Sequence, residues 1–243
     1  MLFRDKKKIS YTCVGHEQSA AMMADAYSRV GPNLAATLST SGPGATNLIT
    51  GIACSWFDSV PVLHITGQVN TYEQIGAQRG TEGVRQIGFQ ETDIVTMVKP
   101  ITKYTVKIKK SSEIQHQLEK AANIAISDRP GPVLVDIPMN IQKEKIILKK
   151  NIFIKTKKTK KSIKKINVRK IHNLVKLIEE SKRPALLIGG GVRNSKTSKE
   201  LKKLIYRLSI PIVSTWSGVD AIGHDEKNYI GTMGVYGTRP ANL

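Results

Sequence analysis

Residues 34–69, LAATLSTSGPGATNLITGIACSWFDSVPVLHITGQV, predict the fold of the first half of the chain. Two short apolar runs, 34–42 and 60–69, carry Gly or Pro near their ends, and a segment of helical character, 45–59, separates them. Parallel neighbouring strands need a long connection, usually a helix, so strand, helix and strand at this spacing predict parallel pairing. The stretch therefore predicts an α/β fold in which helices cover the faces of a parallel sheet.

The same alternation extends on both sides of this stretch. A further apolar run, residues 9–15 (ISYTCVG), and a helical segment, 20–30, precede it. A helical pattern at 113–127 and a buried strand at 132–138 follow it. We expect the run at 9–15 to be a third strand of the same sheet. These elements predict a first doubly wound domain over residues 1–142, with a short N-terminal part.

A lysine-rich segment, residues 143–166, is predicted to be a linker to a second domain. The pattern then restarts with an amphipathic helix at 168–181, a strand ending in three glycines at 183–191, and a further helix and strand. Residues 167–243 therefore predict a second, truncated doubly wound domain, whose last segment begins a helix without a strand to follow it. The fold class is α/β, with two partial parallel-sheet domains.

The net charge of +19 would ordinarily suggest nucleic acid or an acidic membrane surface as a partner. Its distribution argues against both, because lysines crowd into residues 143–165, whereas residues 11–78 contain a single basic side chain, Arg29. The lysine run lacks the repeated aromatic side chains on which single-stranded bases stack. We expect a solvated linker, no nucleic acid and no membrane.

Cysteine use and the N-terminus indicate a cytoplasmic protein. Cys13 and Cys54 form no Cys-x-x-Cys pair, so we expect reduced thiols. The opening residues, MLFRDKKKIS, have basic side chains without the apolar stretch of a secretory signal. No run reaches the roughly 18 apolar residues that a membrane-spanning helix needs.

Two stretches carry candidate chemistry. Residues 40–51, TSGPGATNLITG, lead from a strand into a helix through glycines that permit close approach of a ligand to free N–H groups. An ordinary strand-to-helix turn would have the same pattern, and the stretch is not the Gly-x-Gly-x-x-Gly of dinucleotide folds. In residues 14–30, Glu17 is an acid at the start of a helix rich in Ala and Met. Taken alone, it would be an exposed helix-start acid.

The order of four stretches changes this interpretation. GHEQSAAMMADAYSRV, TSGPGATNLITGIA, DSVPVLHITGQV and GFQETDIVTMVKPITKY follow one another along the chain. Together they resemble the pyrimidine-binding domain of thiamine-diphosphate enzymes, and within that superfamily the large subunit of acetolactate synthase (acetohydroxyacid synthase). RPGPVLVDIP, RPALLIGGGV and IPIVSTW extend the resemblance into that family's middle domain.

The resemblance implies a role for Glu17. In the family, this glutamate hydrogen-bonds a ring nitrogen of the cofactor's aminopyrimidine and favours the imino tautomer, whose nitrogen takes the proton from C2 of the thiazolium ring. Burial among apolar side chains would raise the pKa of Glu17, whereas a helix start would lower it. The sequence leaves open which effect is larger.

Further site residues come from the same resemblance. Thr40, Pro43 and Asn47 resemble the segment that lines the pyrimidine pocket. Gln90 resembles a glutamine that faces the active centre from the neighbouring subunit, although it could instead be a helix-start polar contact. Gln68 follows a strand at the sheet end where α/β folds place ligands.

Members of the family that resemble this chain bind FAD in the middle domain, chiefly as a structural cofactor. The residues that match their flavin site are Gly189, Gly190, Gly191, Arg129 and Thr215. Three glycines after a strand could also be a plain loop. The family commonly has a lysine where this chain has Met139, which is a departure in the wall of the substrate pocket.

The family holds the diphosphate and Mg²⁺ through a Gly-Asp-Gly segment and a later Asn in a third domain, and the sequence contains no such segment. The chain therefore resembles an interior fragment that we expect to be inactive alone.

The expected parent activity is decarboxylation of pyruvate and transfer of the product to a second 2-oxo acid, in isoleucine and valine biosynthesis. We expect a homo-oligomer with the site between subunits, and a regulatory subunit is an open question. The alternatives are another thiamine-diphosphate carboligase or decarboxylase, of sugar or surface-polysaccharide biosynthesis, and a non-catalytic remnant or interaction module.

Overall fold

The computed structural model describes residues 10–31, 34–81, 83–147, 167–195 and 197–243. The chain divides into two compact units, Met1–Lys158 and Thr159–Leu243. The predicted lysine-rich linker lies between the secondary structure of the two units, and its residues 148–166 fall outside the described residues.

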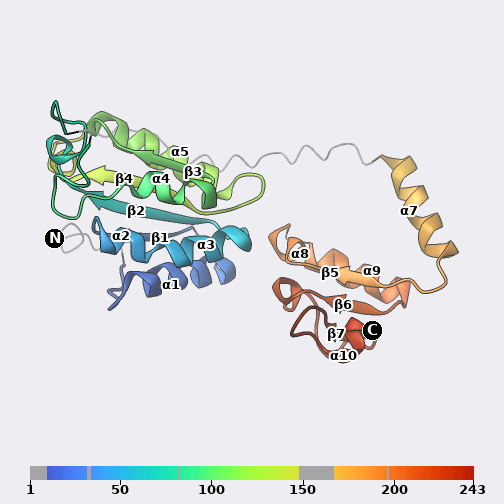
Figure 1. The fold of residues 1–243 in the computed structure, drawn as a ribbon. Coiled ribbons are helices and arrows are strands. Elements are labelled where there is room, and N and C mark those ends of the chain that lie inside the picture. The colour runs from blue at the N-terminus through green and yellow to red at the C-terminus, as the bar shows by residue number, and fades with distance from the viewer. Residues whose placement is uncertain (1–9, 32–33, 82, 148–166, 196) are drawn as a thin grey trace. The chain divides into compact units, whose positions relative to one another are not determined.

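The first unit is built on a parallel sheet of four strands in the order β1-β2-β4-β3 (Figure 1). The strands are β1 (Ala35–Ser39), β2 (Val62–Gln68), β3 (Tyr104–Lys107) and β4 (Val133–Pro138), and each neighbouring pair runs parallel. The predicted strands around residues 34–69 are β1 and β2, and the predicted buried strand at 132–138 is β4. The α/β class with parallel sheets is confirmed.

Helices cover both faces of this sheet, because successive side chains of a strand point to opposite sides. On β4, Leu134 packs against Leu48 and Ile52, whereas Val133 and Val135 face the opposite side. The first face is covered by α1 (Glu17–Val30), α2 (Pro43–Asn47), α3 (Ile49–Phe57) and α4 (Ile94–Val98), and the second by α5 (Ile114–Ile126) and α6 (Met139–Gln142). Short 3-10 helices occupy Thr71–Glu73, Lys99–Ile101 and Ser111–Glu113.

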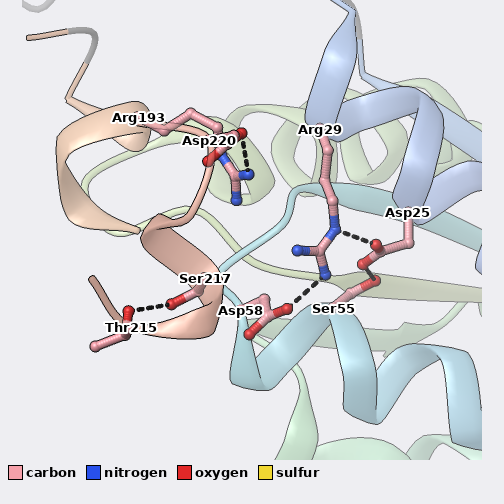
Figure 2. Close-up of polar contacts among 8 residues, drawn as sticks. All are labelled: Asp25, Arg29, Ser55, Asp58, Arg193, Thr215, Ser217 and Asp220. Carbon is pink, nitrogen blue, oxygen red and sulfur yellow. Dashed lines mark hydrogen bonds and ion pairs between the residues drawn. The ribbon is translucent and has the colours of Figure 1, made fainter. Parts of the chain in front are cut away.

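Helices α1 and α3 pack closely and are joined by a polar network (Figure 2). Buried Asp25 on α1 accepts hydrogen bonds from Ser55 Oγ on α3 at 2.7 Å and from Arg29 Nε at 2.5 Å. Arg29 also pairs with Asp58 Oδ2, just after α3, at 2.7 Å. A Cβ at Gly51 would collide with the Cβ of Ala21, so this glycine allows the close approach. The network fixes the helix that begins at Glu17.

The predicted strand at residues 9–15 is wrong for the part of it that is described. Residues 10–14 have no strand structure, and Tyr11 and Cys13 are exposed. A strand needs a neighbour to satisfy its backbone groups, and apolar or β-branched composition alone does not supply one. Among the described residues, the sheet ends at β1 on this side, and its fourth strand is β3, which the sequence pattern did not predict.

The second unit has a parallel sheet in the order β5-β6-β7 (Figure 1). The strands are β5 (Leu186–Ile188), β6 (Ile212–Ser214) and β7 (Tyr229–Thr232). Its helices are α7 (Val168–Glu180), α8 (Gly191–Asn194), α9 (Ser198–Leu208) and α10 (Arg239–Asn242), with a 3-10 turn at Trp216–Gly218. Ile188 and Ile212 pack against Ile205 of α9. In the last segment, β7 precedes the helix start that the sequence predicts, and the sequence pattern did not predict this strand.

Candidate active site

A cleft of about 800 Å³ lies at the carboxyl ends of β1, β2 and β4. Open α/β sheets place ligands at this edge. Its lining combines apolar and polar side chains, including Leu38, Thr40, Ile65, Gln68, Phe89 and Met139. Three residues singled out from the sequence, namely Thr40, Gln68 and Met139, therefore line one cleft.

Glu17 lies beside the turn that borders this cleft. It is the first residue of α1, after His16, whose Nδ1 accepts a hydrogen bond from the backbone N–H of Gln18. Glu17 Oε2 accepts a hydrogen bond from Asn47 Nδ2 at 3.0 Å. A Cβ at Gly44 would be 3.2 Å from Glu17 Oε1. Residues thirty positions apart in the sequence are thus brought together.

The backbone of the turn explains its glycines. Gly42 has φ +60°, which favours glycine, and it precedes Pro43 at the first position of α2, where proline suits a helix start. The N–H of Thr46 closes the turn on the carbonyl of Gly42 at 3.0 Å. At Gly44, a side chain would meet both Thr40 Cγ2, at 2.7 Å, and the Glu17 carboxylate. The turn therefore brings Thr40, Gly44 and Glu17 into contact.

The charge state of Glu17 follows from these contacts. The hydrogen bond from Asn47 lowers the pKa of Glu17 below its ordinary value, and its backbone N–H and His16 act in the same direction. Burial acts the other way but is outweighed. These contacts therefore favour the anion, which is the effect that the sequence left open. A ligand that covers the exposed side of Glu17 would add desolvation and raise the pKa.

Gln90 lies against the same turn from the other side. It has φ +62°, a left-handed conformation that is uncommon for a residue with a side chain. A Cβ at Gly42 would be 2.6 Å from Gln90 Cβ and 2.9 Å from its carbonyl oxygen. Within one chain, the structure thus places Gln90 next to Gly42, while Phe89 lines the cleft.

Gln68 lines the cleft, but its amide is engaged within the protein. Its Nε2 donates to the carbonyl of Thr92 at 2.7 Å and to Asp136 Oδ2 at 3.1 Å, and its Oε1 accepts from the N–H of Val69 at 3.0 Å. The side chain is buried. These contacts give Gln68 a role inside the protein that its position after a strand did not predict.

Asp136 was missed in the sequence, although an acid inside the apolar run VLVDIP was a usable signal. Asp136 is fully buried on β4, and its Oδ1 accepts a hydrogen bond from Thr66 Oγ1 at 2.7 Å. Burial raises the pKa of Asp136 to about 6, against the lowering effect of Thr66, Gln68 and Lys107, while Asp93 raises it further.

Glu91 was also missed, and it organises the loop between β2 and α4. Its Oε1 accepts from the N–H of Ile75 at 2.7 Å, and its Oε2 accepts from the N–H of Ile87 at 3.0 Å. One carboxylate thereby ties two distant points of the loop that precedes Gln90. The residue adjoins Gln90 in FQET, but spacing alone did not indicate its partners.

Burial lowers the pKa of His64, whereas it raises the pKa of Asp136. Burial lowers the pKa of His64 to about 3, and its Nδ1 bonds Thr37 Oγ1 at 2.8 Å. Its Nε2 has no hydrogen-bond partner within the described part of the chain. The unfolded chain therefore binds a proton at His64 first, and the free energy of unfolding falls as the pH drops from 6.5 toward 3.

We expect the effects of His64 and Asp136 on the free energy of unfolding to oppose each other as the pH falls. Folded Asp136 binds a proton before the unfolded chain does, so it raises the free energy of unfolding as the pH falls from about 6 to 3.8. Each group contributes up to about 1.4 kcal/mol per pH unit, with opposite sign. Asp136→Asn should therefore lose stability more steeply than the wild type between pH 6 and 4, and His64→Gln less steeply. Urea unfolding across this range measures both slopes.

Exposed His116→Gln is the control and should leave the wild-type slope unchanged. Parallel pH curves for the wild type, Asp136→Asn and His64→Gln would contradict the opposed titrations.

In the second unit, the three predicted glycines lie at the carboxyl end of β5. A Cβ at Gly190 would be 2.9 Å from the carbonyl oxygen of Ser217, so this glycine allows two loops to approach. Thr215 lies at the neighbouring strand end, where its N–H donates to the carbonyl of Ile188 at 2.8 Å. Its Oγ1 is 3.2 Å from Ser217 Oγ (Figure 2). Gly189, Gly190, Gly191 and Thr215 thus share one edge of this sheet.

Arg129, one of the predicted flavin residues, and Arg193, which follows the three glycines, both have protein partners. Arg129, in the first unit, donates from Nε to Ser59 Oγ at 2.6 Å. Arg193, which follows the glycines, pairs with Asp220 Oδ2 at 2.8 Å (Figure 2). The first contact gives Arg129 a local role at the turn before β4. The predicted role of Arg129 at a flavin stays a prediction.

The described residues contain neither a candidate metal cluster nor a candidate membrane-spanning helix. No group of three or more His, Cys, Asp or Glu side chains there could hold a metal ion. In the same residues, no helix has both the length and the apolar content needed to cross a bilayer.

Comparison with known proteins identifies the family. The profile of the thiamine pyrophosphate enzyme N-terminal TPP binding domain matches residues 1–97, and that of the thiamine pyrophosphate enzyme central domain matches residues 171–243. Together the two matches span well over half of the chain.

Among similar proteins, the probable acetolactate synthase large subunit of Methanocaldococcus jannaschii is 39% identical over 232 residues, covering 93% of this chain and 37% of that protein. The acetolactate synthase large subunit of Cyanidium caldarium is 37% identical over 241 residues, covering 98% of this chain and 40% of that protein. The chain thus spans about two fifths of the length of these relatives. With both domains matched in order, this chain belongs to the thiamine pyrophosphate enzyme family and is similar to acetolactate synthase large subunits.

Proposed function

We propose that this chain supplies the pyrimidine-binding part of a thiamine-diphosphate-dependent, acetolactate synthase-like carboligase. The observation that carries the proposal is the contact of Glu17 with Asn47 and Gly44, beside a cleft at the sheet edge where ligands bind. The relatives named acetolactate synthase large subunit support the choice within the family.

The residues present fit the aminopyrimidine of thiamine diphosphate. Asn47 holds one oxygen of the Glu17 carboxylate, and the other faces a space that a side chain at Gly44 would fill. A carboxyl group with one oxygen hydrogen-bonded by the protein and the other accessible can hydrogen-bond the basic nitrogen of a planar ring. Glu17 would contact that nitrogen, while Thr40, Pro43 and Asn47 would line the ring's surroundings.

The bound cofactor would supply the carbon that accepts and releases the pyruvate-derived fragment. Glu17 would hold a proton at Oε1, on the side facing the ring. The hydrogen bond from Asn47 is the main cause of the lowered pKa of Glu17. Cover by the ring and by a second polypeptide would exclude water and raise this pKa toward the range in which a carboxyl group exchanges protons readily.

Two further cofactors belong to the proposal. FAD would lie against Gly189, Gly190, Gly191 and Thr215, where a backbone without side chains leaves room for close contact. The described residues offer no three-ligand cluster for Mg²⁺, so none of them is assigned to this ion.

The proposal also covers the substrates, the pathway, the cell compartment and the oligomeric state. We expect pyruvate and a second 2-oxo acid as substrates, in isoleucine and valine biosynthesis in the cytoplasm, and a homo-oligomer whose site lies between subunits. A regulatory subunit stays an open expectation. Met139 lines the cleft and is 42% exposed, at the position where the resemblance leads one to expect lysine. This apolar side chain favours, as a second candidate, another thiamine-diphosphate carboligase or decarboxylase with a different substrate.

The full-length gene product tests the proposal. We expect it to convert pyruvate to acetolactate only when thiamine diphosphate and Mg²⁺ are added, and the isolated 243 residues to form none. Turnover of another 2-oxo acid in place of pyruvate would favour the second candidate. Absence of thiamine diphosphate binding and of any turnover would contradict both.

Gly44→Ala should damage this site without unfolding the protein. The new Cβ would be 2.7 Å from Thr40 Cγ2 and 3.2 Å from Glu17 Oε1, so the carboxylate and the turn must shift. Misplacement of a catalytic group by about 1 Å can cost on the order of 100-fold in rate. We expect turnover to fall by roughly 10- to 100-fold.

Gly15→Ala is the matched control, since a Cβ there meets nothing within 4 Å among the described residues. It should keep wild-type turnover. Equal activity of the two variants would contradict the placement of Gly44 against Glu17.

A further inference from the structure

We infer that Asp136 and Gln68 are positioning residues, which hold the loop carrying Gln90 against the turn at Gly42. The inference rests on the proposed function for the part that Gln90 plays. It differs from a direct contact with cofactor, because both side chains are buried and bonded to other protein groups.

The connection runs through three hydrogen bonds. Asp136, in the centre of the sheet, accepts a hydrogen bond at Oδ2 from Gln68 Nε2 at 3.1 Å. The same nitrogen reaches the carbonyl of Thr92 at 2.7 Å, which ties the end of the loop to β2. Thr92 Oγ1 donates to the carbonyl of Gln90 at 3.4 Å, the weakest of the three. A rigid strand is thereby connected to a residue at the edge of the cleft.

Gln90 needs such support because its backbone is strained. A residue with a side chain at φ +62° persists only where its surroundings hold it. Its Cβ and carbonyl oxygen lie where a side chain at Gly42 would be, so the two backbones contact each other directly. Movement of Thr92 would therefore shift Gln90 and release the turn that carries Pro43 and Gly44.

The carboxylate is suited to this role by its geometry. Thr66 Oγ1 donates to Oδ1, and Gln68 Nε2 donates to Oδ2, so each oxygen accepts one bond. Gln68 Nε2 donates one hydrogen to Asp136, and its second hydrogen is donated to the carbonyl of Thr92. Asparagine at 136 could preserve this arrangement, because its carbonyl can face Gln68 while the Thr66 hydroxyl turns to accept from its amide. Leucine could not.

The first test is hydrogen exchange on the 243-residue chain, which requires no cofactor. Gln68→Met should speed exchange of the amides in residues 88–93 and 42–46 by roughly tenfold or more, because a buried tether is lost. Thr66→Val is the matched control, since it removes the other hydrogen bond to Asp136 and leaves Thr92 tethered. Unchanged exchange in residues 88–93 of Gln68→Met would overturn the inference.

The second test uses turnover by the full-length gene product with thiamine diphosphate. If Gln68 and Asp136 position the loop, Gln68→Met should lower turnover, and Asp136→Asn should keep most of the activity that Asp136→Leu loses. Wild-type turnover in Gln68→Met would overturn the inference, as would equal losses in the asparagine and leucine variants. Locally faster exchange in a protein whose wild type has no such turnover would support the tether and contradict the proposed function instead.

Discussion

Glu17→Gln is expected to lower acetolactate formation by the full-length gene product by about 10²- to 10⁴-fold, the range of a lost general acid–base group. Glutamine keeps the size of the side chain and an oxygen for Asn47, which now donates to Glu17 Oε2 at 3.0 Å. It cannot give or take a proton at the atom facing the ring. Steady-state turnover of pyruvate at saturating thiamine diphosphate measures the loss.

Cofactor binding should change much less than turnover in this variant, because the surroundings of the ring are retained. Calorimetric titration with thiamine diphosphate separates the two effects. Glu113→Gln, at the acid preceding α5, is the control and should keep wild-type turnover. A Glu17→Gln protein that binds the cofactor and turns over pyruvate at the wild-type rate would remove Glu17 from the chemistry.

Asp25→Ala is expected to lower the free energy of unfolding by about 3 kcal/mol, at the lower end of the cost of breaking a buried ion pair. The mutation leaves Arg29 with Asp58 alone and removes the acceptor of Ser55 (Figure 2). The side chain of Asp25 is only 9% exposed, so water replaces these partners poorly. Urea denaturation of the 243-residue chain measures the loss.

Asp58→Ala is the matched control in the same network. Its side chain is 40% exposed, and a pair of this exposure contributes about 1 kcal/mol or less. Losses of equal size in the two variants would contradict the assignment of Asp25 as the buried centre of the contact between α1 and α3.

The sequence predicted the strands that lie in continuous apolar runs. β1, β2 and β4 were predicted because each is an apolar run bounded by glycine or proline. The strand at residues 9–15 was wrong because strand formation depends on a neighbour, which the pattern does not reveal. β3 and β7 were missed because YTVK and YIGT contain polar residues or glycine and do not form a continuous apolar run of the kind that marked the predicted strands.

The candidate site was predicted in part. The resemblance singled out Glu17 and Asn47 separately, and the structure adds a hydrogen bond between their side chains. The engagement of Gln68 by Thr92 and Asp136 could not be predicted, because it joins residues up to 68 positions apart through one amide group. The charge of Glu17 also depended on contacts, since the hydrogen bond from Asn47 outweighs burial in lowering its pKa.

The most direct test of the account is the rate at which the C2 hydrogen of thiamine diphosphate exchanges with deuterium on the full-length gene product, measured by quenched-flow NMR. If Glu17 holds the proton at the aminopyrimidine, Glu17→Gln should slow this exchange by about 100-fold or more while the cofactor stays bound. Exchange at the wild-type rate on cofactor-saturated Glu17→Gln would contradict the account.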